Sequence, residues 1–350
     1  MNRMFYLFLF NLILLTSCTQ DVSLKNITLN FDEKHEVLID TMNIIKLETT
    51  ENSLLYDIGH IEYVDSKYFV YSRNLVRAFD MQGNFLFNLS QKGEGPNEYF
   101  SLHNITSDSK CIFLYDFNAS RILCFDFEGN YLSDIKLNCD IDQVHPAKVF
   151  YLNENTFLTY NSYAGDEMGV PVLSLWNNTL DKQKYIGGRT LQSGLRFADG
   201  CYVSEDKRIL YWEPAKDTLF QVINNILSPL YKIDFGKHAM PGEIAKKDDY
   251  ERIMFLGRKE NFKYASLARY YQRKDDVLYF SCIYNGVVYI CSYNEVNGNV
   301  GVYSFYDVNN HYKACPFYKI VDDFIILELK DNRNEENNHV LYKFPIDHLK

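Results

Sequence analysis

The chain has 350 residues and a formal net charge of −10, with 47% hydrophobic and 23% charged residues. This composition is that of a globular protein and excludes a disordered one. The acidic charge, with no run of basic residues, also excludes a surface that binds nucleic-acid phosphates, so we expect no nucleic-acid partner.

The first residues predict export and a lipid anchor. Residues 1–17 have the pattern of a signal peptide, because Arg3 precedes an apolar stretch that is too short for the ~20 residues of a membrane span. The sequence Leu15-Thr16-Ser17-Cys18 resembles the lipobox of bacterial lipoproteins, which implies that lipidated Cys18 becomes the mature N-terminus. An ordinary signal peptide followed by a chance cysteine is the alternative.

The lipobox resemblance also implies where the mature protein resides. Two or more acyl chains hold a protein firmly on a lipid bilayer, at ~0.8 kcal/mol per buried methylene. Thr19 stands where an aspartate would signal retention, so the resemblance implies the outer membrane of the cell envelope. We expect residues 18–37 to form the lipidated N-terminus and a linker.

Seven further cysteines follow, an odd number that leaves at least one unpaired. Their spacing fits neither a zinc motif nor a compact disulfide framework. Most lie in apolar, strand-like runs, where a cysteine usually acts as a small buried hydrophobe. They are Cys111, Cys124, Cys139, Cys201, Cys282, Cys291 and Cys315.

A repeat with a period of 46 residues begins early in the body of the chain. Phe79-Asp80 and Phe125-Asp126 are each followed by two residues and then Gly-Asn, between apolar runs. An Asp three residues before a Gly is typical of a hairpin with a type I turn, in which the Gly takes the left-handed conformation. Later runs are less regular, but Asn285-Gly286 is a strong two-residue hairpin signal.

The apolar runs are continuous rather than alternating, which indicates sheets that are covered on both faces. The abundance of Tyr and Phe, 28 and 25 residues, also favours β-structure. Residues 41–345 have the length of six such repeats once the charged segment 237–265 is set aside. We therefore predict an all-β protein, a single six-bladed β-propeller over residues 38–350 with four-stranded antiparallel blades.

Segment 237–265 breaks the rhythm of the strands and is predicted as a short helical insert between blades 4 and 5. Ile244, Tyr250, Ile253 and Met254 have helical spacing and form its expected apolar face. We expect the insert to pack on the propeller as a connection, with a functional lid as the alternative.

The heptapeptide Gly93-Glu94-Gly95-Pro96-Asn97-Glu98-Tyr99 resembles a segment of the six-bladed β-propeller lipoproteins of Bacteroidetes, of the NHL/TolB-like type. The resemblance implies fold and lineage but no activity. We expect Gly93 and Gly95 to permit positive φ and Pro96 to stiffen a crossing between blades. Glu98 is expected to cap backbone amides and Tyr99 to pack beneath the loop. Contact with a ligand is the alternative for this motif.

No catalytic residue can be assigned from motifs. The eight histidines are scattered, and neither His-Glu-x-x-His nor Gly-x-Ser-x-Gly occurs. No cofactor is identified, although Ca²⁺ is a candidate because propellers can hold it with acidic and amide oxygens. Asp116, Asn118 and Asp126 are of this type, but turn capping or a local ion pair explains them better.

Two functions of different class therefore remain. The first is a non-enzymatic envelope lipoprotein whose propeller binds a glycan, a peptide or a protein partner. The alternative is a calcium-dependent lactonase or esterase-like hydrolase that uses the central channel. The hydrolase requires acidic and amide side chains to converge at one end of that channel, so a lining of apolar or Lys/Arg side chains would exclude it.

The substitution Cys18→Ala removes the only atom that the lipobox would lipidate. We expect the variant to leave the membrane fraction and appear in the soluble fraction, whereas Cys111→Ser should stay membrane-bound. Fractionation followed by immunoblotting measures the distribution. A Cys18→Ala variant that remained in the membrane would contradict the anchor.

Overall fold

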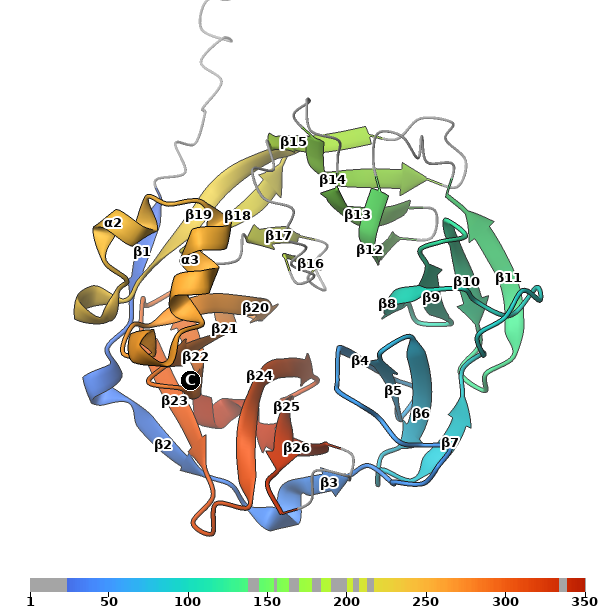
Figure 1. The fold of residues 1–350 in the computed structure, drawn as a ribbon, viewed down its shortest axis with the longest axis horizontal. Coiled ribbons are helices and arrows are strands. Elements are labelled where there is room, and N and C mark those ends of the chain that lie inside the picture. The colour runs from blue at the N-terminus through green and yellow to red at the C-terminus, as the bar shows by residue number, and fades with distance from the viewer. Residues whose placement is uncertain are drawn as a thin grey trace, which may run out of the picture.

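The computed structural model describes residues 24–137, 145–153, 156–163, 170–177, 184–189, 200–203, 208–212, 217–333 and 339–349. Within these ranges, six β-sheets are arranged as a ring around a central axis (Figure 1). The predicted six-bladed β-propeller is confirmed. In the first five blades the antiparallel strands run from the axis outward in chain order, and in the sixth the outermost strand comes from the beginning of the chain. We number the blades from β4 onward.

The first three blades contain only their own four strands. Blade 1 comprises β4 (His60–Val64), β5 (Lys67–Ser72), β6 (Leu75–Asp80) and β7 (Phe85–Asn88). Blade 2 comprises β8 (Leu102–Ser107), β9 (Ile112–Asp116), β10 (Arg121–Phe125) and β11 (Tyr131–Lys136). Blade 3 comprises β12 (His145–Asn153), β13 (Thr156–Tyr163), β14 (Val170–Asn177) and β15 (Lys184–Arg189).

The other three blades each accept a strand from the N-terminal segment. Blade 4 has β16 (Cys201–Val203), β17 (Ile209–Trp212), β18 (Thr218–Ile223) and β19 (Ile226–Asp234). Blade 5 has β20 (Ser266–Lys274), β21 (Val277–Tyr284), β22 (Val287–Asn294) and β23 (Val300–Tyr306). Blade 6 has β24 (Tyr312–Val321), β25 (Phe324–Asp331) and β26 (Val340–Pro345), followed by the 3₁₀ turn η5 (Ile346–Leu349).

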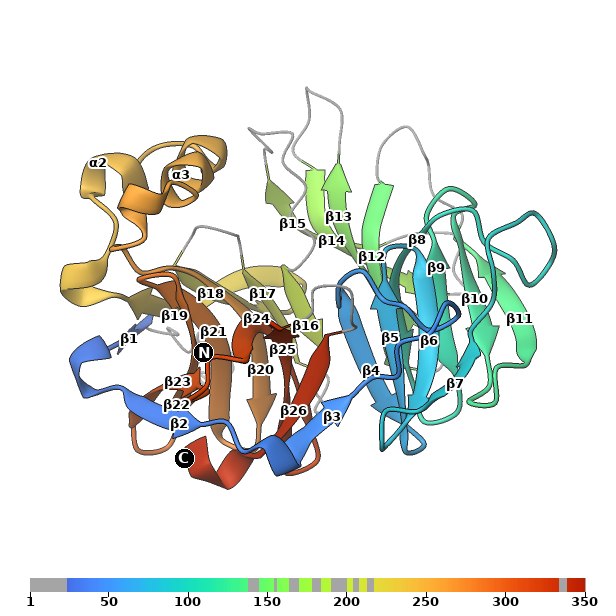
Figure 2. The same cartoon turned by 60° about the horizontal axis from the view of Figure 1, so that its bottom comes forward.

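The N-terminal segment, residues 25–46, runs along the outer rim of blades 4, 5 and 6 (Figures 1 and 2). Its strands β1 (Lys25–Thr28) and β2 (His35–Leu38) add to β19 and β23 in parallel. Strand β3 (Ile44–Lys46) pairs antiparallel with β26 and is the fourth strand of blade 6. The 3₁₀ turns η1 (Phe31–Glu33) and η2 (Thr41–Asn43) separate these strands.

This segment corrects two expectations. Residues 25–37 lie in the fold rather than in a linker, and blades 4 and 5 carry a fifth, parallel strand. The side chains of Ile27, Leu29 and Phe31 are buried, and this hydrophobic packing anchors the segment to the blades. Four-residue strands that add to a distant edge carry little local signal, because their partners lie about two hundred residues away or more.

The repeated turns form as their sequence predicts. Asp80 accepts hydrogen bonds from the backbone of Gln82 and Asn84, and Asp126 does the same for Glu128 and Asn130. The glycines of these turns, Gly83 and Gly129, have φ of 89° and 88°. Asn285 and Gly286 also both have positive φ, as a two-residue type I′ hairpin requires.

The insert between blades 4 and 5 is helical, as predicted, and its helices stand on one face of the ring (Figure 2). It contains η3 (Gly236–His238), α2 (Gly242–Ala245), α3 (Asp249–Leu256) and η4 (Lys259–Asn261). Asp248 caps α3 by accepting from the Glu251 amide at 2.8 Å. The expected apolar face is wrong in part, since Tyr250 and Met254 are exposed whereas Leu256 is buried.

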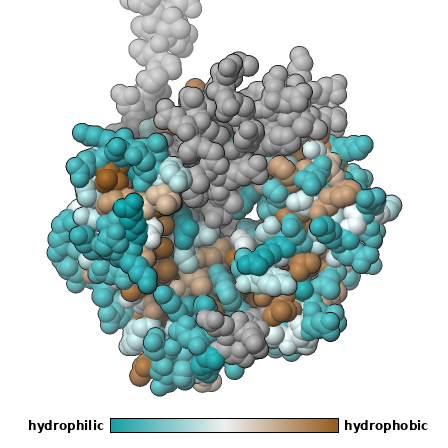
Figure 3. Space-filling model, viewed as in Figure 1, coloured by the Kyte–Doolittle hydropathy of each residue, from teal (hydrophilic) through white to brown (hydrophobic). Residues whose placement is uncertain are grey.

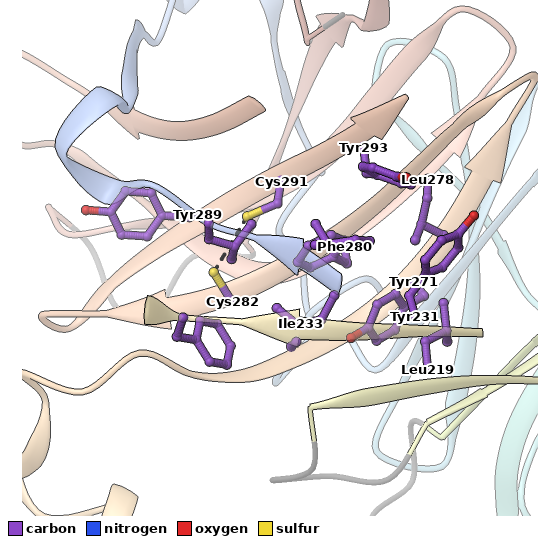
Figure 4. Close-up of a cluster of buried hydrophobic side chains, with 14 of the residues drawn as sticks. Leu219, Tyr231, Ile233, Tyr271, Leu278, Phe280, Cys282, Tyr289, Cys291 and Tyr293 are labelled. Carbon is purple, nitrogen blue, oxygen red and sulfur yellow. Dashed lines mark hydrogen bonds between the residues drawn. The ribbon is translucent and has the colours of Figure 1, made fainter. Parts of the chain in front are cut away.

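The hydrophobic core lies between neighbouring blades. Figure 4 shows the cluster between blades 4 and 5, where Tyr231 and Ile233 of β19 face Phe280 and Cys291 of blade 5. In the same cluster Cys282 and Cys291 are fully buried free cysteines whose sulfur atoms are 3.7 Å apart. Each sheet is covered on one face by the preceding blade and on the other by the following blade. The strands are therefore continuous apolar runs in the sequence.

Gly83 is predicted to be essential for closing the ring. A Cβ there would lie 2.2 Å from the backbone oxygen of Lys46 in β3, and φ would stay positive. We expect Gly83→Ala to lower the free energy of unfolding by roughly 3 kcal/mol, the combined cost of strain and overlap. Gly298→Ala is the matched control, because Gly298 has φ of 77° and open space around it.

Only the backbone strain should destabilise the Gly298 variant, by about 1 kcal/mol. Urea unfolding of the two variants measures the difference. Equal losses of stability would contradict a special role for the contact between Gly83 and β3.

Candidate functional site

The candidate site is a cavity of about 260 Å³ on the central axis. The innermost strand of every blade contributes to its wall, from β4 of blade 1 to β24 of blade 6. Figure 3 shows the face of the molecule seen down this axis, which is mostly hydrophilic with scattered hydrophobic side chains. The six-fold arrangement therefore gathers side chains that lie far apart in the sequence around one small volume.

Glu62 of β4 is the centre of a polar cluster in this wall. Its carboxylate is 2.8 Å from Nε2 of His60 and accepts from Oγ of Ser107 at 3.0 Å and from Nζ of Lys319 at 3.3 Å. Ser107 belongs to blade 2 and Lys319 to blade 6. Glu62 thus joins three consecutive blades at the axis, on both sides of the point where the ring closes.

The electrostatics of this cluster keep Glu62 charged and His60 neutral. Burial raises the pKa of Glu62, but the charge of Lys319 and the hydrogen bonds from His60 and Ser107 outweigh it, so that the pKa falls to about 2. Burial lowers the pKa of His60 below its usual 6.5, and the hydrogen bond to Glu62 offsets this only in part. Since its pKa is so low, Glu62 is a weak base at neutral pH.

Aromatic side chains form another part of the wall. Tyr270 and Phe317 pack edge to face, with ring centroids 5.6 Å apart, and His60 packs against Phe317 at 6.1 Å. Tyr270 has φ of 54°, which is unusual for a bulky residue, and lies within the register shift between Arg269 and Gln272 of β20. Bulges and strained residues of this kind aim side chains at functional sites.

Two buried tyrosines in the wall lack hydrogen-bond partners. The hydroxyls of Tyr271 and Tyr318 find none among the described residues, although both side chains are about 1% exposed. Burial raises the pKa of both phenols well above 10, so they remain donors. An unsatisfied buried hydroxyl costs about 1–3 kcal/mol, and neither of these two oxygen atoms is exposed to the cavity.

Gln272 holds blades 5 and 6 in register beside the cavity. Its amide nitrogen donates to the carbonyl of Tyr318 at 2.9 Å, and its amide oxygen accepts from the backbone of Ile320 at 2.8 Å. Both ends of this side chain are therefore occupied by backbone.

The heptapeptide motif lies away from the cavity, in the connection between blades 1 and 2. Glu98 accepts from the Gly95 amide at 2.8 Å, and the Tyr99 side chain is buried. The expectation of positive φ at Gly93 and Gly95 is wrong. Glycine is needed there because the Glu98 carboxylate fills the space of a side chain, at 2.0 and 3.1 Å from a Cβ built on each.

Pro96 stands at the turn of the motif, and its carbonyl accepts a long hydrogen bond of 3.5 Å from Arg121 of blade 2. The Arg121 guanidinium also donates to the carbonyl of Glu98 at 2.5 Å. The contacts of the motif are therefore made within the loop and with blades 1 and 2.

The candidate calcium residues do not converge on the channel. Asp116 is fully buried, accepts from the amides of Phe100 and Ser101, and lies 3.6 Å from Arg121. Asp126 caps its hairpin, and Asn118 is exposed in a turn. Among the described lining residues Glu62 is the only carboxylate and Gln272 the only carboxamide. The described wall thus lacks the acidic and amide convergence that the hydrolase requires.

Cys18 lies outside the described residues. Motif reasoning also missed every residue of the cavity, because His60, Glu62, Ser107 and Lys319 come from three blades and form no local pattern. A weak signal existed in the first strand of blade 1, where the polar residues His60 and Glu62 alternate with apolar ones. None of the helices in the described part of the chain is long and apolar enough to cross a membrane.

Fold and site together define a six-bladed β-propeller with a small axial cavity. The chain belongs to the family described as domain of unknown function DUF4934, whose model matches residues 22–342. No curated protein matches the sequence.

Two solved structures from Bacteroides species share the fold. One is a protein of Bacteroides fragilis described as exported, with a TM-score of 0.67 and 16% identity over 91% of this chain and 99% of that one. The other is a member of the DUF4221 family from Bacteroides vulgatus, with a TM-score of 0.52 and 9% identity over 87% of this chain and 94% of that one. At these identities the likeness shows the fold.

The low pKa of Glu62 predicts a pH-dependent contribution to stability. A carboxyl whose pKa is lower in the folded state stabilises the fold above its ordinary pKa of 4.5, and this stabilisation is lost as the pH falls toward 2. The shift corresponds to about 3 kcal/mol. Urea unfolding of Glu62→Gln should therefore show a large deficit at pH 6 that shrinks by pH 3.

Exposed Glu260 in the helical insert offers a control. Glu260→Gln should retain the pH dependence of the wild type. A deficit of Glu62→Gln that stayed constant between pH 6 and pH 3 would contradict the assignment.

Proposed function

We propose that this protein is a non-enzymatic binding module of the cell envelope, whose axial cavity holds the terminal unit of an acidic glycan. The observation that carries the proposal is the wall of this cavity. It combines partly exposed aromatic side chains with polar and lysine side chains around one small volume. Sugar rings are bound by this combination of apolar faces and polar partners.

The size of the cavity supports a small terminal group rather than the surface of a folded partner. At about 260 Å³ it lies just below the ~300–1,000 Å³ of pockets for drug-sized ligands. One sugar ring or one amino-acid side chain is the appropriate scale, with the rest of the chain outside.

The charges favour an acidic terminal group. Lys148 and Lys319 face one glutamate among the described lining residues, and His60 is held neutral by burial. The chain as a whole has a charge of −10, so the cavity contrasts with its surroundings. Fixed lysines in a narrow, low-dielectric volume attract anions more strongly than lysines on an open surface.

The wall does not favour the hydrolase. The single carboxylate that lines the described part of the cavity is a weak base with three partners, and the single carboxamide is bound to backbone. Calcium prefers six to eight oxygen ligands. We therefore propose binding without a chemical step.

An envelope location fits this proposal. The sequence begins with a signal-like segment and a lipobox-like Cys18, and one structural relative is described as exported. A lipid anchor would hold the propeller close to surface or periplasmic glycans and raise their effective concentration.

Tyr270→Ala tests the aromatic wall. The substitution keeps a Cβ and therefore the same strained backbone, while it removes the ring that lines the cavity. We expect the affinity for an acidic oligosaccharide, selected from a glycan array, to fall roughly tenfold, equivalent to ~1.4 kcal/mol. Titration calorimetry measures the change, and Tyr306→Ala, on the outer strand β23 and 44% exposed, should bind normally.

Binding of neutral and acidic oligosaccharides with equal affinity would remove the charge argument. Selective binding of carboxylate-ending peptides, with no glycan bound, would replace the glycan by a peptide. Equal affinity of the Tyr270 and Tyr306 variants would place the ligand elsewhere on the propeller.

A further inference from the structure

A second cluster of reactive side chains lies in blade 6, outside the axial cavity. Among the described residues, Cys315, Glu328 and His339 bring a thiol, a carboxylate oxygen and an imidazole nitrogen within 4.8 Å of one another. They come from β24, from β25 and from the residue that precedes β26. Nδ1 of His339 is in direct contact with the Glu328 carboxylate.

The register of blade 6 explains this convergence. Ala314 pairs with Leu329 and Leu329 with Val340, so the neighbouring residues Cys315, Glu328 and His339 are close across three strands. The register of β24 shifts between Ala314 and Tyr318. Cys315 lies at the start of this bulge, and bulges characteristically redirect side chains toward sites.

The environment is costly for these groups as they stand. Glu328 is 5% exposed, and burial raises its pKa despite the contact with His339 and a hydrogen bond from the Ile58 amide. The charge of Asp57 raises that pKa further. Burial raises the pKa of Cys315 to about 12, and the charge of Glu328 contributes. The Glu328 carboxylate and the Cys315 thiol thus share this site with the His339 imidazole, while Asp57 is paired with Arg73 at 3.6 Å.

A divalent cation would resolve this arrangement. It would take up the thiolate and the carboxylate as ligands and reverse the direction of both pKa shifts. Imidazole, thiolate and carboxylate are together the ligand set of zinc and similar ions, whereas calcium and magnesium require oxygen ligands. Three protein ligands leave a fourth position for water.

We propose that Cys315, Glu328 and His339 form a binding site for one divalent transition-metal ion of the zinc type. The site lies where the ring closes, because blade 6 supplies the three ligands and the Ile58 amide beside Glu328 belongs to the approach to blade 1. Its occupation would therefore stabilise the closed ring. The proposal is independent of what the axial cavity binds.

The test uses the full chain in detergent, purified under reducing conditions and freed of metal by chelation. Titration with Zn²⁺ should show one ion bound per chain and a melting temperature raised by several degrees, with no such rise for Ca²⁺. Co²⁺ should give the near-ultraviolet charge-transfer band of a cobalt–thiolate bond. Metal bound at a chance thiol of another part of the chain would not raise the stability in this way.

Variants assign the site. Cys315→Ser and His339→Gln should each weaken Zn²⁺ binding by about 100-fold. Cys315→Ser should also abolish the cobalt–thiolate band, whereas His339→Gln should only alter it. Cys111→Ser is the matched control, since Cys111 is a partly buried free thiol of blade 2 outside the cluster, and it should bind Zn²⁺ as the wild type does.

Two results would overturn the proposal. One is a wild-type chain that binds no Zn²⁺ even at Zn²⁺ concentrations well above the dissociation constants of ordinary zinc sites in proteins. The other is Zn²⁺ binding of unchanged affinity in both Cys315→Ser and His339→Gln. Circular dichroism confirms that each variant is folded before its affinity is compared.

Discussion

The pairing of β3 with β26 closes the ring, and the arrangement of the axial cavity depends on that closure. Residues 44–46 from the beginning of the chain complete the blade formed by residues 312–345 at its end. Without this pairing blade 6 would expose an edge, and blades 6 and 1 would be free to separate. Propellers rely on such closure because each blade contacts only its neighbours, so that an open ring would leave the first and the last blade with one neighbour each.

We call the junction between blades 6 and 1 the seam. Polar contacts hold it together at several distances from the axis. At the outer rim the Glu48 amide donates to Gly83 of the first repeated turn at 2.8 Å, directly after β3. At the axis, Lys319 of blade 6 reaches Glu62 of blade 1. Between them the Ile58 amide donates to Glu328. The last two contacts join the end of the chain to its beginning, across a junction that has no covalent continuity.

These polar contacts have energetic costs that hydrophobic packing avoids, and the junction of blades 6 and 1 contains such packing too, in the cluster that joins Ile61 to Phe317 and Ile326. Blades 4 and 5 meet through a cluster of Tyr, Phe, Leu and Cys side chains (Figure 4), and such packing is non-directional. Hydrogen bonds and ion pairs require a defined geometry and are expensive when one partner is missing. When such polar contacts are added to the apolar packing of the junction, they specify one register of closure, which a small axial cavity needs.

The sequence predicts those parts of the fold that local physics decides. The Asp80 and Asp126 turns, the Asn285-Gly286 hairpin and the number of blades follow from turn chemistry and from a 46-residue period. The parallel strands β1 and β2 were not predictable, because a four-residue segment does not specify which sheet edge, about two hundred positions away or more, it pairs with. The same reason hid the axial residues, whose proximity exists only after six inner strands have been arranged around one axis.

The cluster of Cys315, Glu328 and His339 shows most directly why sequence spacing cannot predict such a site. Positions 315, 328 and 339 match no zinc motif, and the sequence therefore indicates a buried hydrophobe at Cys315. In the fold, the spacing is set by hairpin lengths, because Cys315 in β24 and Glu328 in β25 are close across the β24–β25 pair and His339, just before β26, lies diagonally opposite Glu328. Metal motifs with short spacings describe ligands on one loop or helix, whereas a propeller blade assembles ligands across strands. Clusters of this kind must therefore be sought by register rather than by sequence interval.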